Sequence, residues 1–175
     1  MLCAQRTGHI ITISSIAGLI GQEFASAYAI SKKFALEGWM ESLHFDVQPY
    51  GIHTAIVEPG FFRTELLVDA STRWPELTID YYAERTGAQK KWWQAQNGQQ
   101  VGDPAKLARA LLELAHGEQP PQRWVGGADA IDAATGKVAQ LKQQVEAPRE
   151  LGLTLALDDV EAATAGPSPR TPLTE

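Results

Sequence analysis

The chain has 175 residues, which suits one domain or part of a larger one, and its hydrophobic content of 44% can support a core. A net charge of −6 argues against two acidic kinds of partner, nucleic acid and an anionic membrane surface. The chain has no apolar run that could span a membrane and no recognisable signal peptide, and its single cysteine, Cys3, excludes an internal disulfide and fits a reducing cytoplasm.

The first third of the chain predicts two strands joined by a long helix. Residues 9–14 are nearly all apolar and β-branched, as expected of a strand buried on both faces of a parallel sheet. Gly18 then ends the apolar pattern and predicts a loop. A helical pattern follows from about residue 26 to 47. A second strand is predicted over 52–57. Because a helix links the two strands, we expect them to be parallel.

The helix predicted over 26–47 carries two apolar stripes. One stripe consists of Tyr28, Lys32, Ala35, Leu36, Trp39 and Leu43, and the other of Ala27, Ile30, Phe34, Gly38 and Phe45. A helix that is apolar on two sides is usually buried twice, so we expect this helix to pack against the sheet and against a second partner.

Residues 61–100 lack strong periodicity but hold five tryptophan and tyrosine residues, with Gly87 and Gly98 as breaks. We interpret this segment as a lid over an apolar substrate, although core packing of two short helices explains the aromatic residues about as well.

The last elements have clear boundary signals. Asp103 followed by proline predicts a helix that runs to about residue 116. A short strand is predicted at 123–125 and a final helix at 129–146. The many Pro, Ala and Thr residues of 147–175 predict a poorly ordered tail.

Three polar residues near the first strand form the main candidate site. Ser15 ends the first strand, Tyr28 lies thirteen positions later, and Lys32 lies one helical turn after Tyr28. A hydroxyl, a phenol and an ammonium that converge on one oxygen can move a proton to or from an alcohol or carbonyl. An ammonium at about 4 Å would stabilise the phenolate by about 4 kcal/mol at an effective dielectric of about 20.

The spacing of these residues resembles the short-chain dehydrogenase/reductase family. Its signature is a serine, then Tyr-x-x-x-Lys, then Pro-Gly after the next strand. The chain has Ser15, Tyr28-Ala-Ile-Ser-Lys32 and Pro59-Gly60, followed by Thr64, in that order. The resemblance extends from residue 1 to about residue 146.

The resemblance implies a function and a role for each of these residues. In the family, the tyrosine is the acid/base of hydride transfer between an alcohol or ketone and the nicotinamide of NAD or NADP. Ser15 would hold the substrate oxygen, and Tyr28 and Lys32 would also contact the cofactor, Lys32 at its ribose. Pro59-Gly60 would let the backbone approach the nicotinamide, and Thr64 would contact the cofactor amide or phosphates. The helix over 26–47 would join subunits of a homo-oligomer.

The family's dinucleotide site begins with a glycine-rich turn upstream of the tyrosine, and no Gly-x-Gly-x-x-Gly occurs in this chain. We therefore expect an α/β fold: a partial Rossmann-like, doubly wound parallel sheet lacking its N-terminal dinucleotide-binding half. Residues 1–146 would form the C-terminal part of that domain, and the chain alone would be inactive. The scattered histidines predict no metal site.

A second interpretation remains open. The chain can instead be a non-catalytic, truncated remnant that cannot bind cofactor and associates with partners, at most, through its two-striped helix. A glycine-rich strand, turn and helix encoded in frame upstream of Met1 would favour the enzyme.

Overall fold

The computed structural model describes residues 2–29, 34–74, 76 and 78–157. The chain divides into two compact units, Met1–Ala134 and Thr135–Glu175. The first unit contains the sheet and every described candidate site residue.

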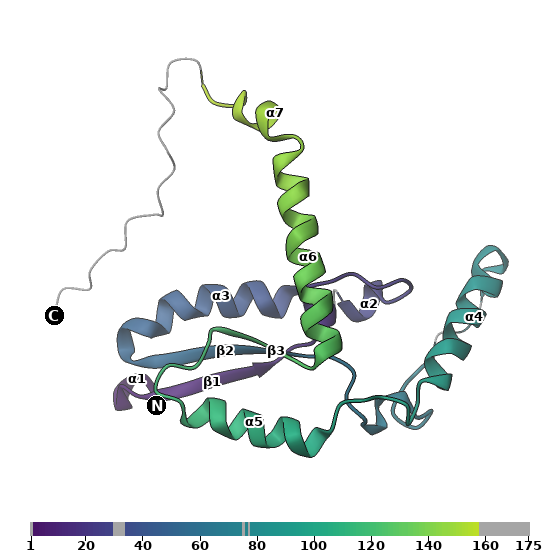
Figure 1. Ribbon diagram of the computed structural model, residues 1–175, viewed down its shortest axis with the longest axis horizontal. Coiled ribbons are helices and arrows are strands. Elements are labelled where there is room, and N and C mark those ends of the chain that lie inside the picture. The colour runs from purple at the N-terminus through teal and green to yellow at the C-terminus, as the bar shows by residue number, and fades with distance from the viewer. Residues whose placement is uncertain (1, 30–33, 75, 77, 158–175) are drawn as a thin grey trace. The chain divides into compact units, whose positions relative to one another are not determined.

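The sheet has three parallel strands in the order β1-β2-β3, which are Gly8–Ile13, Ile52–Pro59 and Arg123–Gly126 (Figure 1). In β1 and β2, Gly8 lies opposite Ile52 and Ile13 opposite Val57. All three strands therefore end at the same edge of the sheet. The expected α/β fold with parallel strands is confirmed.

The predicted helices are found with small changes. Residues expected in one long helix form α2, Ser26–Ala29, and α3, Ala35–Val47, and the residues between them lie outside the described part. Helix α5 is Pro104–His116 and α6 is Ala128–Glu146. Helices α3 and α5 lie on opposite sides of the strands (Figure 1). Short helical segments complete the fold: α1 Leu2–Gln5, η1 Ile16–Gly18, η3 Gln48–Tyr50, η4 Glu65–Leu67 and α7 Arg149–Leu153.

The N-terminus of α5 is capped as predicted. The Asp103 carboxylate accepts hydrogen bonds from the backbone N–H groups of Ala105 at 2.8 Å and Lys106 at 3.3 Å. These two bonds stabilise the charged form and lower the pKa of Asp103.

Three features differ from the sequence expectations. Helix α4, Asp80–Ala95, was not predicted, and Gly87 lies inside it rather than breaking the chain. Helix α7 lies in the segment expected to be a poorly ordered tail, of which residues 158–175 are outside the described part. Strand β1 is only half-buried because, within the described chain, it has a hydrogen-bonded neighbour on one side only.

Strand β2 lies between the other two strands and supplies most of the core. Ile52, Ile56 and Val57 are fully buried, as is Met40 of α3. A second cluster joins Ile16 of η1 to small residues of α6, Ala130 and Ala134. This second cluster packs the turn after β1 against the start of α6.

A buried network of charges connects the ends of the strands to α3. Arg123 of β3 pairs with Glu37, with Glu58, and with Glu41 at 2.7 Å. Glu37 also accepts a hydrogen bond from Ser14 Oγ at 2.6 Å. Because the Glu58 and Glu37 side chains are only 0% and 7% exposed, they depend on Arg123 for neutralisation.

Removing the arginine of this network should therefore destabilise the protein strongly. We expect Arg123→Met to lower the free energy of unfolding by about 3–5 kcal/mol, since it leaves two buried carboxylates unpaired. Urea denaturation of the whole encoded protein measures the change. Arg149→Met is the matched control, because Arg149 pairs with Glu146 where both side chains are more than half exposed and should cost about 0–1 kcal/mol. Equal stability of the two variants would contradict the prediction.

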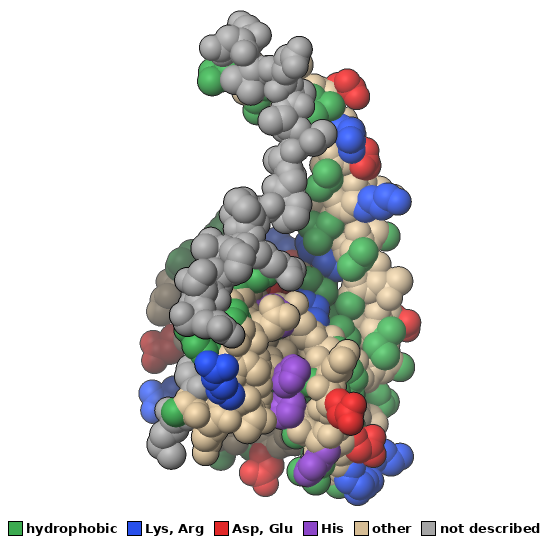
Figure 2. Space-filling view, turned by 90° about the vertical axis from the view of Figure 1, so that its left-hand side faces the viewer, with side chains coloured by type: hydrophobic (Ala, Val, Ile, Leu, Met, Phe, Trp, Pro, Cys, Tyr) green, Lys and Arg blue, Asp and Glu red, His purple; other side chains and the backbone are tan. Residues whose placement is uncertain are grey.

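Histidine side chains gather on the face seen in Figure 2. His9 and His53 are partners in the β1–β2 register, and their rings stack with centroids 5.1 Å apart. Within the described part of the chain, no group of three His, Cys, Asp or Glu side chains is arranged to hold a metal ion. None of the described helices combines the length and the apolar character needed to cross a membrane.

Candidate functional site

Ser15 follows β1 at the edge where the parallel strands end. It is the N-cap of η1, and its hydroxyl accepts a hydrogen bond from the backbone N–H of Ala17 at 3.2 Å. The preceding residue, Ser14, is buried and bonds Glu37 instead. Ser14 and Ser15 therefore lie in different environments. Of the two, only Ser15 lines the cavity described below.

Tyr28 lies in α2 and is 41% exposed. It lines the same cavity as Ser15, although the two residues come from separate elements. Lys32, the third residue of the predicted triplet, lies outside the described residues.

Pro59 ends β2, and Gly60 continues from it along the cavity wall. The Gly60 N–H donates to the carbonyl of Gly126 at 2.9 Å, and the next N–H, that of Phe61, donates to Asp129 Oδ2 at 2.8 Å. A Cβ at Gly60 would lie 2.4 Å from Asp129 Oδ2. A side chain at Gly60 would therefore displace the Asp129 carboxylate, which accepts the hydrogen bond that holds the Phe61 N–H.

Thr64 is the exposed N-cap of η4, where its hydroxyl accepts a hydrogen bond from the Leu66 N–H at 3.4 Å. It does not line the cavity, whereas Leu66 and Leu67 of the same turn do. The structure thus brings Ser15, Tyr28 and Gly60 to one cavity and leaves Thr64 beside it.

The cavity has a volume of about 630 Å³ and lies at the edge where β1 and β2 end. Its lining is largely apolar and aromatic and includes Ile16, Phe24, Phe61, Phe62, Leu66, Trp74 and Trp93. A cavity of this size and character suits a small organic molecule with an apolar body.

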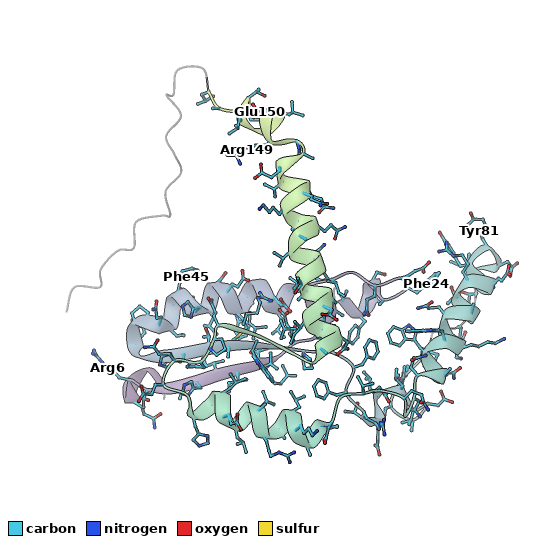
Figure 3. All side chains as sticks on the ribbon, viewed as in Figure 1. Arg6, Phe24, Phe45, Tyr81, Arg149 and Glu150 are labelled. Carbon is cyan, nitrogen blue, oxygen red and sulfur yellow. The ribbon has the colours of Figure 1, made fainter. Side chains whose placement is uncertain are left out.

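Helix α4 and the turns before it contribute Leu66, Leu67, Trp74 and Trp93 to the cavity lining. Whether this segment acts as a lid stays a prediction. The Phe61 and Trp93 rings stack with centroids 5.5 Å apart. Arg85 of α4 pairs with Glu23, and its guanidinium lies 5.4 Å from the centroid of the Phe24 ring. Figure 3 labels Phe24 in the loop before α2, on the side of α4. The Arg85 contacts therefore join α4 to the loop that precedes Tyr28.

A network of polar side chains connects distant parts of the segment 61–100. Asp69 accepts hydrogen bonds from Trp74 Nε1 at 3.0 Å and Gln94 Nε2 at 3.1 Å. The Gln94 bond first, and then the Trp74 bond, lower the pKa of Asp69. Because the pKa is lowered, the stabilisation is present at neutral pH and is lost as pH falls through the pKa of the folded protein.

Main-chain hydrogen bonds join the two ends of the segment 61–100. Phe62 and Gly102 form a parallel bridge in which the Gly102 N–H donates to Phe61 O and the Arg63 N–H donates to Gly102 O, both at 2.9 Å. The residues that enter and leave the lid are therefore held side by side.

Two functional candidates were missed by the sequence reasoning. Asp129 was seen only as the start of a helix, and its contact with Phe61 joins residues far apart in the chain. Gln100 lines the cavity but stands in a polar run that carries no motif. No local pattern in the sequence signals either contact.

The chain is similar to known oxidoreductases. The sequence profile of a family described as short chain dehydrogenase matches residues 1–74. Oxidoreductase BOA17 of Botryotinia fuckeliana is 35% identical over 157 residues, which are 89% of this chain and 56% of that protein. The uncharacterized oxidoreductase YusZ of Bacillus subtilis is 37% identical over 112 residues, 61% of this chain and 38% of YusZ.

A solved structure extends the match to the fold. The crystal structure of a short-chain dehydrogenase from Streptomyces avermitilis superposes with a TM-score of 0.73 at 30% identity, covering 89% of this chain and 55% of that one. The chain thus spans about half the length of these relatives.

Proposed function

Because the chain belongs to the short-chain dehydrogenase/reductase family, we propose that the whole protein is an NAD- or NADP-dependent oxidoreductase that interconverts a small-molecule alcohol and ketone. The observation that carries this proposal is the cavity, whose wall includes Ser15, Tyr28 and Gly60 although they come from three separate segments. All three residues belong to the motif; of its other members, Pro59 and Thr64 do not line the cavity, and Lys32 lies outside the described residues.

In the proposed reaction, Tyr28 moves the proton. During reduction, its phenol donates a proton to the substrate oxygen as the carbonyl carbon receives a hydride. During oxidation, the phenolate accepts the alcohol proton as the hydride leaves. A nicotinamide dinucleotide supplies or accepts the hydride. Ser15 holds the substrate oxygen by a hydrogen bond, and the Lys32 ammonium stabilises the phenolate.

The described residues fit one end of such a cofactor. Gly60 lines the cavity where β2 ends, and the family resemblance implies that the nicotinamide ring approaches the backbone there. Lys32 and Thr64 would bind the ribose and the amide or phosphate groups. The apolar remainder of the cavity is then left for the substrate, which fits an alcohol or ketone with an apolar body.

The proposal includes a homo-oligomer formed through the segment of residues 26–47. Besides Tyr28, three large side chains of this segment are exposed in the single chain: Phe34 at 46%, Trp39 at 54% and Phe45 at 63%. Exposed aromatic groups on one helix suit burial against a second copy.

Dehydrogenase assays on the whole encoded protein test the function. We expect nicotinamide absorbance to change with NAD or NADP in the presence of apolar secondary alcohols or the corresponding ketones. The non-catalytic interpretation would be favoured if a folded, oligomeric protein gave no absorbance change with either cofactor and any alcohol or ketone of a broad panel.

A further inference from the structure

One polar atom in the cavity region has no partner. Gln100 is 5% exposed, and its Oε1 is a buried acceptor without a hydrogen bond from the described residues. Two other side-chain atoms in the described chain share this state, His9 Nε2 and Glu58 Oε2, but neither of those residues lines the cavity. A buried acceptor that lacks a hydrogen bond destabilises the protein. A ligand that donates a hydrogen bond to Gln100 Oε1 can offset this cost.

The backbone around Gln100 is fixed, so its side chain is held in a definite place. The Gln100 carbonyl accepts a hydrogen bond from Arg63 Nε at 3.1 Å, and two residues later Gly102 forms the bridge at the base of the lid. Apolar and aromatic side chains, Phe61 and Phe62 among them, line the cavity near this position. An amide in such surroundings recognises a polar group with high selectivity, because water competes poorly there.

We propose that Gln100 is a ligand-binding residue whose amide oxygen accepts a hydrogen bond from an N–H or O–H group of the molecule bound in this cavity. The inference rests on the proposed function, in which the cavity holds the substrate and the nicotinamide end of the cofactor. Two sources can supply the donor: a second hydroxyl on an otherwise apolar substrate, or the carboxamide of the cofactor. In either case Gln100 determines specificity and takes no part in proton transfer.

The test compares ligands that differ only in the donor. For the substrate, the probes are linear secondary alcohols of several chain lengths that carry a terminal hydroxyl, their analogues without that hydroxyl, and the terminal methyl ethers. For the cofactor, the probes are NAD and its acetylpyridine analogue, which has a methyl ketone in place of the amide. Binding is measured by calorimetry on the whole encoded protein, so the result does not require turnover.

The variants are Gln100→Met, which keeps the size of the side chain and removes the acceptor, and Gln99→Met as control. Gln99 is the exposed neighbour and does not line the cavity. We expect Gln100→Met to melt at the same or a higher temperature, since it removes an unmet buried group. We also expect it to bind the donor-bearing ligand at least about tenfold more weakly, with the donor-free analogues unchanged.

The two sources give different results. A selective loss in the diol series assigns the donor to the substrate, and a selective loss of NAD relative to its acetylpyridine analogue assigns it to the cofactor. If Gln100→Met does not fold, the test uses the wild-type protein alone: its preference for donor-bearing over donor-free ligands in each series decides the outcome. The inference is overturned if the wild-type protein binds donor-bearing and donor-free ligands equally in both series, or if Gln100→Met leaves both preferences intact. Selective binding without turnover would contradict the proposed reaction while leaving the role of Gln100 intact.

Discussion

Tyr28→Phe is expected to lower kcat of the whole enzyme by about a hundredfold to ten-thousandfold, the usual contribution of a positioned acid or base. The substitution removes only the phenolic oxygen, so the apolar lining of the cavity is preserved. Affinity for the dinucleotide should change little, because Lys32, Gly60 and Thr64 are untouched. Steady-state rates and a fluorescence titration with the reduced cofactor measure the two quantities.

Tyr50→Phe is the matched control for this prediction. Tyr50 lies in η3, just before β2 begins, whereas the cavity lies where the strand ends. The kcat of the Tyr50→Phe variant should equal that of the wild-type protein. A Tyr28→Phe enzyme that keeps its activity within threefold of the control would refute the acid/base role of Tyr28.

Residues 1–175 expressed alone are expected to show no measurable binding of NAD(H) or NADP(H). The candidate contacts of this chain, through Lys32, Pro59-Gly60 and Thr64, reach only the nicotinamide-ribose end of the dinucleotide. The sequence holds no Gly-x-Gly-x-x-Gly turn to place a helix N-terminus at the pyrophosphate. Most of the binding free energy should therefore be missing, while ordering of the lid would still cost entropy.

Calorimetry or fluorescence titration checks this prediction, with the protein encoded by the entire reading frame as the comparison. A protein in which a glycine-rich strand, turn and helix precede residue 1 should recover both dinucleotide binding and dehydrogenase activity. Micromolar binding by residues 1–175 would show that the cofactor site lies elsewhere in the chain.

The parallel sheet could be predicted from the sequence because its signals are local. β1 and β2 are short apolar runs joined by a helical pattern, and Asp103 followed by proline marks the start of α5. The order Ser15, Tyr28 and Pro59-Gly60 is likewise a pattern along the chain. The roles of these residues stay predictions.

The features that the sequence did not predict have no such pattern. Helix α4 contains Gly87, which costs about 1 kcal/mol relative to alanine inside a helix, and its aromatic residues are not gathered into one stripe. Its position depends on contacts with distant residues, such as that of Arg85 with Glu23. The Arg123 network is similar, because its carboxylates come from α3 and β2.

The bridge between Phe62 and Gly102 makes the lid an insertion whose two ends are already joined. Because the ends are held together, a change in the length of the intervening chain alters the loop-closure entropy only slowly, by about 0.6 kcal/mol per doubling. The turn at Gly60 and the strand ends then need not move when the lid is rebuilt. We therefore expect that residues 64–101 can be exchanged as a unit, which would change part of the apolar cavity lining while Ser15 and Tyr28 keep their positions.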